Sequence, residues 1–240
     1  MTFRLSAGML LAFSVTCFAM LREEVTRSAA RVNVLGDIAE AFRNGQLVMV
    51  FTCLFLAQAA IQVTQPTLVL YIDRLSDGRN STLFSGVVYS IAGLGTVAGA
   101  TFAARRNENG AGLDRLGHES LFLMGLLGSA AFSALQGVWV AIVPLAAFRL
   151  LLGAFNGILT VHGNVLAATA VSREFRGRAF GVMSGVLPFG SVTGPLIGGI
   201  VGEGLGLGSA FYASSLLFLV SGGVLAVFRR RPAAQRQAAG

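Results

Sequence analysis

Seven apolar stretches of about 20 residues set the strongest limit on what this chain can fold into. Each is long enough to cross the hydrocarbon core of a bilayer, which is about 30 Å thick, as an α-helix. Gln136-Gly137 offers the tight turn that divides the nearly uncharged region 120–170 into two helices. The stretches lie at about 5–21, 46–71, 83–104, 120–138, 141–167, 179–201 and 208–228. The sequence therefore predicts an all-α, polytopic bundle of transmembrane helices.

The composition excludes a water-soluble domain. Apolar residues make up 54% of the chain and charged residues 12%, and the mean hydropathy is +0.72. Soluble domains usually carry about twice that share of charge. The net charge of +7 comes from eighteen arginines, eleven acids and no lysine. Because these arginines lie in short loops between apolar stretches, nucleic acid is not an expected partner, and the lipid bilayer is.

The arginines alternate between the loops, which predicts the orientation of the chain. Fourteen lie in the loops 22–44, 105–119 and 171–178 and in the tail after residue 228, whereas Arg74 and Arg79 are the two in the intervening loops. Loops rich in arginine stay on the cytoplasmic side of a membrane. We therefore expect a multi-pass protein of the plasma (cytoplasmic) membrane with its C-terminus in the cytoplasm.

The chain divides into four expected parts: a transmembrane helix at 1–21, a cytoplasmic loop at 22–44, a six-helix bundle at 45–228 and a basic cytoplasmic tail at 229–240. The first stretch lacks a good cleavage site for a signal peptide, which favours a membrane helix. Such a start is typical of a chain that begins inside a longer protein. Residues 36–43 form either a short amphipathic surface helix or part of a mobile linker.

Three local patterns lie in order along the bundle. A tight loop holds Gly112, Asp114, Arg115 and Gly117, in which the aspartate can cap the next helix. Arg149 carries a charge inside an apolar stretch, and Gly153 and Gly157 follow it on the same helix. We expect its side chain either to face a cavity or a partner, or to snorkel to the helix end. The sixth stretch repeats glycine every fourth residue and contains two prolines, Pro188 and Pro195, as flexible points of a packed or a moving helix. Its motif residues are Gly190, Gly194, Pro195, Gly198 and Gly199.

In this order the three patterns resemble the major facilitator superfamily of transporters, in particular its drug and sugar efflux branch. The aspartate–arginine loop is similar to the family's signature between the eighth and ninth helices, Arg149 to the tenth helix, and the glycine–proline stretch to the eleventh. The resemblance implies a six-helix second half preceded by one extra helix, the family's sixth. The halves of this family are repeats, so the same patterns also mark helices two to five of a first half. The charged loop before the first full crossing and the arginine-rich tail favour the second half.

Two polar stripes indicate a transport path. Gln58, Gln62 and Gln65 share one helix face, and Arg149, Asn156, Thr160 and Asn164 share another. We expect both stripes to face the bundle interior or water, unless the amides only bond one helix to another. In the family resembled, these two helices line the central cavity.

The remaining patterns exclude other functions. No Asp or Glu is expected deep in a stretch, and the family resembled commonly places its coupling acid in the first half. His162 lies off the polar stripe and is expected to be an isolated, packed imidazole. No nucleotide-binding loop, catalytic arrangement or metal motif is present, so we expect neither an enzyme nor a cofactor nor a metal.

Two hypotheses follow. One is a transporter, or half of one, that moves a small-molecule solute, with efflux favoured by analogy, by alternating access with a separate N-terminal half or a second copy of the chain. The other is a truncated or accessory membrane protein without activity of its own. The substrate cannot be read from the residues.

Overall fold

The computed structural model describes residues 2–20, 36, 39, 42–76, 80–108, 115–139 and 141–230. It divides into two units, residues 1–33 and residues 34–240, which we describe separately. The first contains one helix, α1 (Thr2–Met20). Its 19 residues extend about 28 Å, close to the thickness of the hydrocarbon core. The helix confirms the predicted element, and its crossing of the membrane stays a prediction.

The second unit contains six spans that are long and apolar enough to cross a membrane, as counted over the described residues. The first span consists of two successive helices, α3 and α4, and each of the others is a single helix. They are α3 (Gly45–Val63), α4 (Gln65–Leu75), α5 (Ser81–Glu108), α6 (Arg115–Val138), α7 (Ile142–Thr169), α8 (Arg176–Leu205) and α9 (Ser209–Arg229). The all-α bundle predicted from the sequence is thus confirmed. The predicted surface helix at 36–43 falls mostly outside the described residues.

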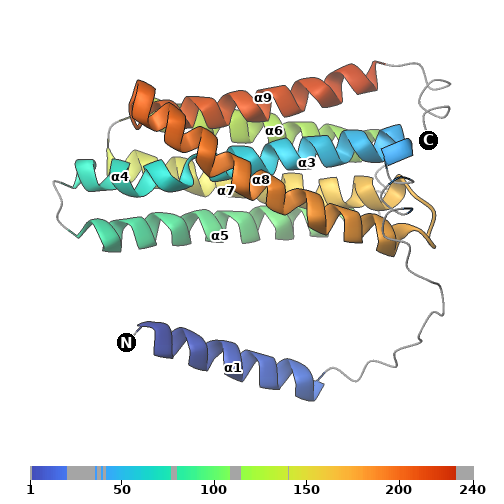
Figure 1. Ribbon diagram of the computed structural model, residues 1–240, viewed down its shortest axis with the longest axis horizontal. Coiled ribbons are helices and arrows are strands. Elements are labelled where there is room, and N and C mark those ends of the chain that lie inside the picture. Colours follow the sequence, from blue (N-terminus) through green and yellow to red (C-terminus); the bar gives the residue numbers. More distant parts are fainter. Residues whose placement is uncertain are drawn as a thin grey trace. The chain divides into compact units, whose positions relative to one another are not determined.

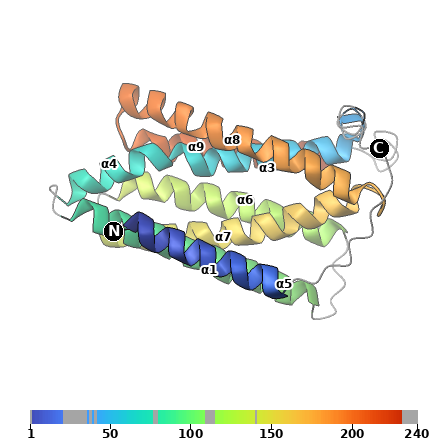
Figure 2. The ribbon, with the colours of Figure 1, turned by 60° about the horizontal axis from the view of Figure 1, so that its bottom comes forward.

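Neighbouring spans run in opposite directions, so that the start of α3, the end of α7 and the start of α8 meet at one end of the bundle (Figure 1). The described arginines of this end, which we call the arginine-rich end, are Arg43, Arg105, Arg106, Arg115, Arg173, Arg176, Arg178, Arg229 and Arg230. Helix α7 packs against α5 and α6, α3 packs against α8 and α9, and α6 packs against α9 (Figure 2).

Glycines bring the backbones of two helix pairs into direct contact. In α8, a Cβ on Gly190 would lie 2.8 Å from the carbonyl oxygen of Phe55, and one on Gly198 would collide with that of Val63. The α5–α7 pair is built in the same way, because a Cβ on Gly99 would collide with the Ala154 carbonyl oxygen. Small residues allow such close approach between membrane helices. The glycine face predicted from the four-residue repeat is therefore the face that α8 packs against α3.

The first span is interrupted at Thr64, where α3 ends and α4 begins. Pro66 lies in the first turn of α4 and has no backbone N–H to continue the hydrogen bonds of α3. By contrast, α8 runs without a break through Pro188 and Pro195. The apolar run 46–71 therefore contains an interruption that hydropathy does not reveal.

The interruption separates two hydrophobic clusters. The larger cluster contains Leu47, Phe51 and Leu54 of α3 packed with residues of α6 to α9, such as Phe122 and Phe218. The smaller one contains Leu68, Tyr71 and Ile72 of α4 with Val88, Leu145 and Phe211. The two halves of the first span thus belong to different parts of the core.

Two adjacent glycines test the close approach of α8 to α3. Substitution Gly198→Ala should lower the free energy of unfolding by about 1–3 kcal/mol, because the new methyl group must push α8 away from the Val63 carbonyl. Gly199→Ala is the matched control, since its Cβ would meet nothing within 4 Å. Thermal unfolding in detergent measures both. Equal midpoints for the two variants would contradict the packing described.

Candidate functional site

Arg149 of α7 is a buried cation beside the junction of α3 and α4. Its side chain is 4% exposed, and its Nη2 donates a hydrogen bond of 3.0 Å to Thr64 Oγ1. The guanidinium lies 6.0 Å from the centre of the Phe211 ring, within the range of a cation–π contact. Among the described residues, no carboxylate lies within ion-pair distance of it, and Arg149 Nε has no hydrogen-bond acceptor. Arg149 therefore points into the bundle and does not snorkel to a helix end.

Gln58 and Gln62 of the first span lie against the glycine face of α8, at Gly190 and Gly194. Gln58 Nε2 donates to Ser191 Oγ over 3.0 Å, and Gln65 Nε2 donates to Gln62 Oε1 over 3.3 Å. All three side chains are half-buried. Gln58 therefore joins one helix to another, whereas Gln62 and Gln65 bond each other along the span.

The polar residues predicted to share one face of α7 have different surroundings. Asn156 is buried and its Oδ1 accepts a hydrogen bond from Ser129 Oγ of α6, over 3.3 Å. Asn164 is half-buried, and Thr160 is exposed and donates to the Asn156 carbonyl of its own helix. Gly153 packs against the α5 backbone at Ala92. Arg149 and Asn156 thus lie in the interior, and Thr160 does not.

His162 is not isolated, and that expectation was wrong. Its Nδ1 lies 2.9 Å from Nδ1 of His118, the fourth residue of α6, and His162 is 1% exposed. One ring nitrogen must donate and the other accept for this hydrogen bond to form. The pair joins α6 to α7, and the sequence missed it because the two residues are 44 positions apart.

The neighbouring residue of α6 is also buried. Glu119 is 1% exposed, and its Oε2 lies 3.4 Å from Nε of Arg229 at the end of α9. Arg229 Nη2 also donates to Ser120 Oγ over 3.1 Å. This carboxylate lies in the first two turns of α6, at the arginine-rich end, so the deep interior still has no acid among the described residues. Its position at the edge of a predicted loop hid it from the sequence analysis.

The loop motif is described only in part. Gly112 and Asp114 lie outside the described residues, so the predicted cap is not seen. Arg115 is the first residue of α6, and Gly117 lies in its first turn. In the glycine–proline helix, Gly190, Gly194 and Gly198 face α3, whereas Gly199 points away from it and Pro195 is half-buried.

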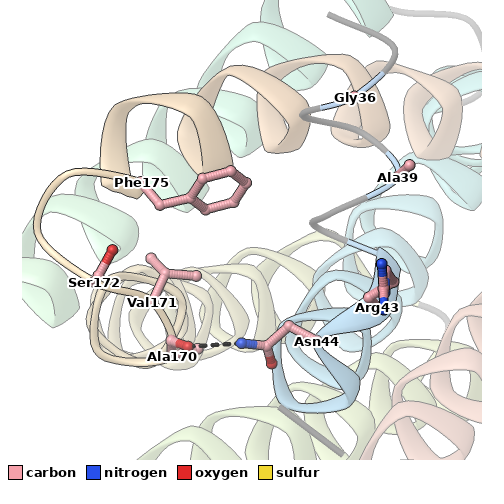
Figure 3. Close-up of a pocket in the computed structure, with 8 residues that line it drawn as sticks. All are labelled: Gly36, Ala39, Arg43, Asn44, Ala170, Val171, Ser172 and Phe175. Atoms are coloured by element: carbon pink, nitrogen blue, oxygen red, sulfur yellow. Dashed lines mark hydrogen bonds between the residues drawn. The ribbon is translucent and has the colours of Figure 1, made fainter. Parts of the chain in front are cut away.

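A cavity of about 760 Å³ opens at the arginine-rich end (Figure 3). Asn44 lies at its edge: its Oδ1 accepts from the backbone N–H groups of Gln46 and Leu47, and its Nδ2 donates to the Ala170 carbonyl over 2.9 Å. Arg176 Nε donates to the Ala168 carbonyl over 2.8 Å. These bonds tie the starts of α3 and α8 to the end of α7. Of the described residues that line this cavity, Arg43, Asn44 and Ser172 carry polar side chains.

The interior thus offers hydrogen bonding and one positive charge, with no cluster of three metal-ligating side chains among the described residues. Such a set can bind a polar group or position a helix. Sequence reasoning missed Thr64, His118, Glu119 and Arg229 as interior partners. The sequence Thr64-Gln65-Pro66 carried a usable signal, because residues just before a proline are disfavoured in a continuing helix.

Comparison with known proteins agrees with this architecture. Residues 109–240 match the family model of the Major Facilitator Superfamily. Relatives named multidrug resistance protein MdtG come from Yersinia enterocolitica (33% identical, over 67% of this chain and 38% of the relative) and Enterobacter lignolyticus (34%, over 69% and 38%). The same name belongs to a relative from Proteus mirabilis that is 30% identical over 75% of this chain and 43% of its own length.

The chain therefore matches about two fifths of the length of each of these relatives. The family match covers more than half of the chain, and it includes the aspartate–arginine loop, Arg149 and the glycine–proline helix. The matched residues contain α6, α7, α8 and α9, which are four of the six apolar spans among the described residues. The chain belongs to the Major Facilitator Superfamily.

Proposed function

We propose that this chain is the second six-helix bundle of an efflux transporter, and that it moves a small solute across the cytoplasmic membrane by alternating access together with a first bundle. The observation that carries the proposal is the match to relatives named for multidrug resistance over about two fifths of their length. A partial match of this size corresponds to one half of a two-bundle transporter. The first bundle would be a separate chain or an adjoining segment, and pairing with a second copy of this chain is the alternative that the flux experiment tests.

The polar residues of the bundle support a solute path. Polar side chains are expensive in hydrocarbon and usually face other helices or a water-filled cavity. The side chains of Gln62 and Gln65 are half-buried and bond only to each other, so their remaining side-chain donors and acceptors can meet a solute. Gln58 and Asn164 are half-buried near the same interior, and Arg149 and Asn156 are buried beside them. In the outward and inward states, we expect the half-buried glutamines, Asn164 and the exposed Thr160 to face the gap between the two bundles, while Arg149 and Asn156 stay buried within this bundle.

Flux into proteoliposomes tests the requirement for a second bundle, with ethidium as the probe solute. One preparation contains this chain alone, a second contains it with the first bundle of a matching relative, and a third contains no protein. We expect ethidium flux only in the second preparation. Flux from the chain alone would show that two copies suffice, which contradicts the need for a separate first bundle. Flux in neither would contradict transport.

A second candidate is a truncated or accessory membrane protein without transport activity. The observation that favours it is the same two-fifths coverage of the relatives. Under this alternative the chain would bind a first bundle, or fold alone, without producing flux in any preparation. Co-purification of the two bundles combined with zero flux would identify the accessory role.

Gln62→Leu tests the polar path. We expect the substitution to lower ethidium flux about fivefold, the effect of losing a hydrogen bond of about 1 kcal/mol to the solute. The thermal midpoint should change little, because Gln62 makes no side-chain hydrogen bond to another span. Thr101→Val on the exposed face of α5 is the control, since its hydroxyl bonds only the Val97 carbonyl of its own helix. Unchanged flux in Gln62→Leu would remove this residue from the path.

A further inference from the structure

The junction at Thr64 is a place where the first span can bend. Pro66 removes one backbone hydrogen bond of the helix ladder, and Thr64 adopts a conformation (φ −83°, ψ −9°) that ends α3. Figures 1 and 2 show α4 continuing along the path of α3 beyond this point. Because α3 and α4 belong to separate hydrophobic clusters, a change of angle between them need not disturb the larger core.

Space for such a movement exists beside α4. A cavity of about 360 Å³ lies between α4 and the far end of α8, and Pro66, Leu70 and Arg74 line it from α4. Gly199 and Gly202 line it from α8. On its other side α4 packs tightly, since Leu68 and Ile72 are fully buried. Helix α4 therefore packs closely on the side of Leu68 and Ile72, whereas toward α8 it makes a close contact at Thr67 with Gly202 and borders the cavity.

Two side chains from other helices bond the junction itself. Arg149 Nη2 of α7 donates to Thr64 Oγ1 over 3.0 Å, and that hydroxyl donates in turn to the Ile61 carbonyl over 3.2 Å. Tyr89 Oη of α5 donates to the Gln65 carbonyl over 3.2 Å. The Arg149 charge thus reaches, through one hydroxyl, the carbonyl end of α3, where a cation is favoured by the helix dipole.

The same contact explains how a buried cation is tolerated without a carboxylate. The Phe211 ring and the end of α3 supply negative potential, yet Nε of Arg149 lacks an acceptor. An unsatisfied buried donor costs free energy that a different arrangement of the junction can recover. The contact therefore joins α7 to the α3–α4 junction and leaves one guanidinium donor, Nε, available for a different arrangement of the junction.

We propose that Arg149 is a positioning residue for transport: by donating to Thr64 Oγ1 it fixes the angle between α3 and α4, and release of this bond lets α4 swing into the space beside α8. That this movement opens and closes the far end of a solute path rests on the proposed function. The movement itself can be measured without a solute or a second bundle. Arg149 acts here through Thr64 and need not touch the solute.

Hydrogen exchange of the purified full chain in detergent tests this inference. Thr64→Val keeps the shape of the side chain and removes the acceptor for Arg149. We expect amide exchange over residues 68–75 to become about five- to tenfold faster, with α3, α6 and α7 unchanged. Thr64→Ser restores a hydroxyl and should restore slow exchange. Thr101→Val, whose hydroxyl bonds only its own helix, is the matched control and should leave α4 unchanged.

Two outcomes would overturn the proposal. Exchange over 68–75 that is the same in Thr64→Val and the original chain would mean that the bond does not hold α4. Faster exchange across all six spans would mean that Thr64 and Arg149 only stabilise the bundle as a whole. Either result leaves the ethidium experiment free to succeed or fail, so the two proposals are tested separately.

Discussion

Contact between helix backbones is the constraint on which the rest of this bundle depends. Hydrocarbon chains surround the helices and are as apolar as leucine, so helices gain little from hiding apolar surface from lipid and must gain from close packing instead. Gly190, Gly194 and Gly198 let α8 lie directly on the α3 carbonyls, and Gly95 and Gly99 do the same for α5 on α7. These two contacts fix the positions of the helices that carry the glutamines and Arg149. Replacing a glycine in either contact by a residue with a side chain would push the two helices, and the polar groups they carry, apart.

Polar groups in the interior are few, and most are paired between helices. Asn44 and Arg176 bond the end of α7, His118 pairs with His162, and Ser129 bonds Asn156. Each pairing joins two different helices, and its hydrogen-bond geometry constrains their relative orientation in addition to the close approach that the glycines allow. Gln62, Gln65 and Arg149 are only partly paired and gather around the break in the first span, and Ser85 and Gln136 are further described residues with a buried atom that lacks a hydrogen-bond partner. The candidate path and the candidate hinge therefore lie in one region.

The spans and the glycine face could be predicted because both depend on spacing within one helix. Gly190, Gly194 and Gly198 recur every four residues and must share a face, whatever packs on it. The His118–His162 pair could not be predicted, because it depends on how far α6 is shifted along α7. The break at Thr64 was hidden because both of its sides are apolar, and only Pro66 marked it. Glu119 was missed because burial at a helix start depends on its neighbour, Arg229 of α9.

The hydrogen bonds between α3 and α9 have a consequence for how the bundle is made. Ser214 Oγ donates to the Ala60 carbonyl, and Ser221 Oγ donates to the Cys53 carbonyl, across 154 and 168 residues of chain. During synthesis, α7 meets its packing partners α5 and α6 as soon as it enters the bilayer. Helix α3 enters before all of them, yet its main partners, α8 and α9, are made last. The ribosome must therefore nearly finish this bundle before α3 can pack against its main partners. Until then, α3 is surrounded by lipid or by the insertion machinery.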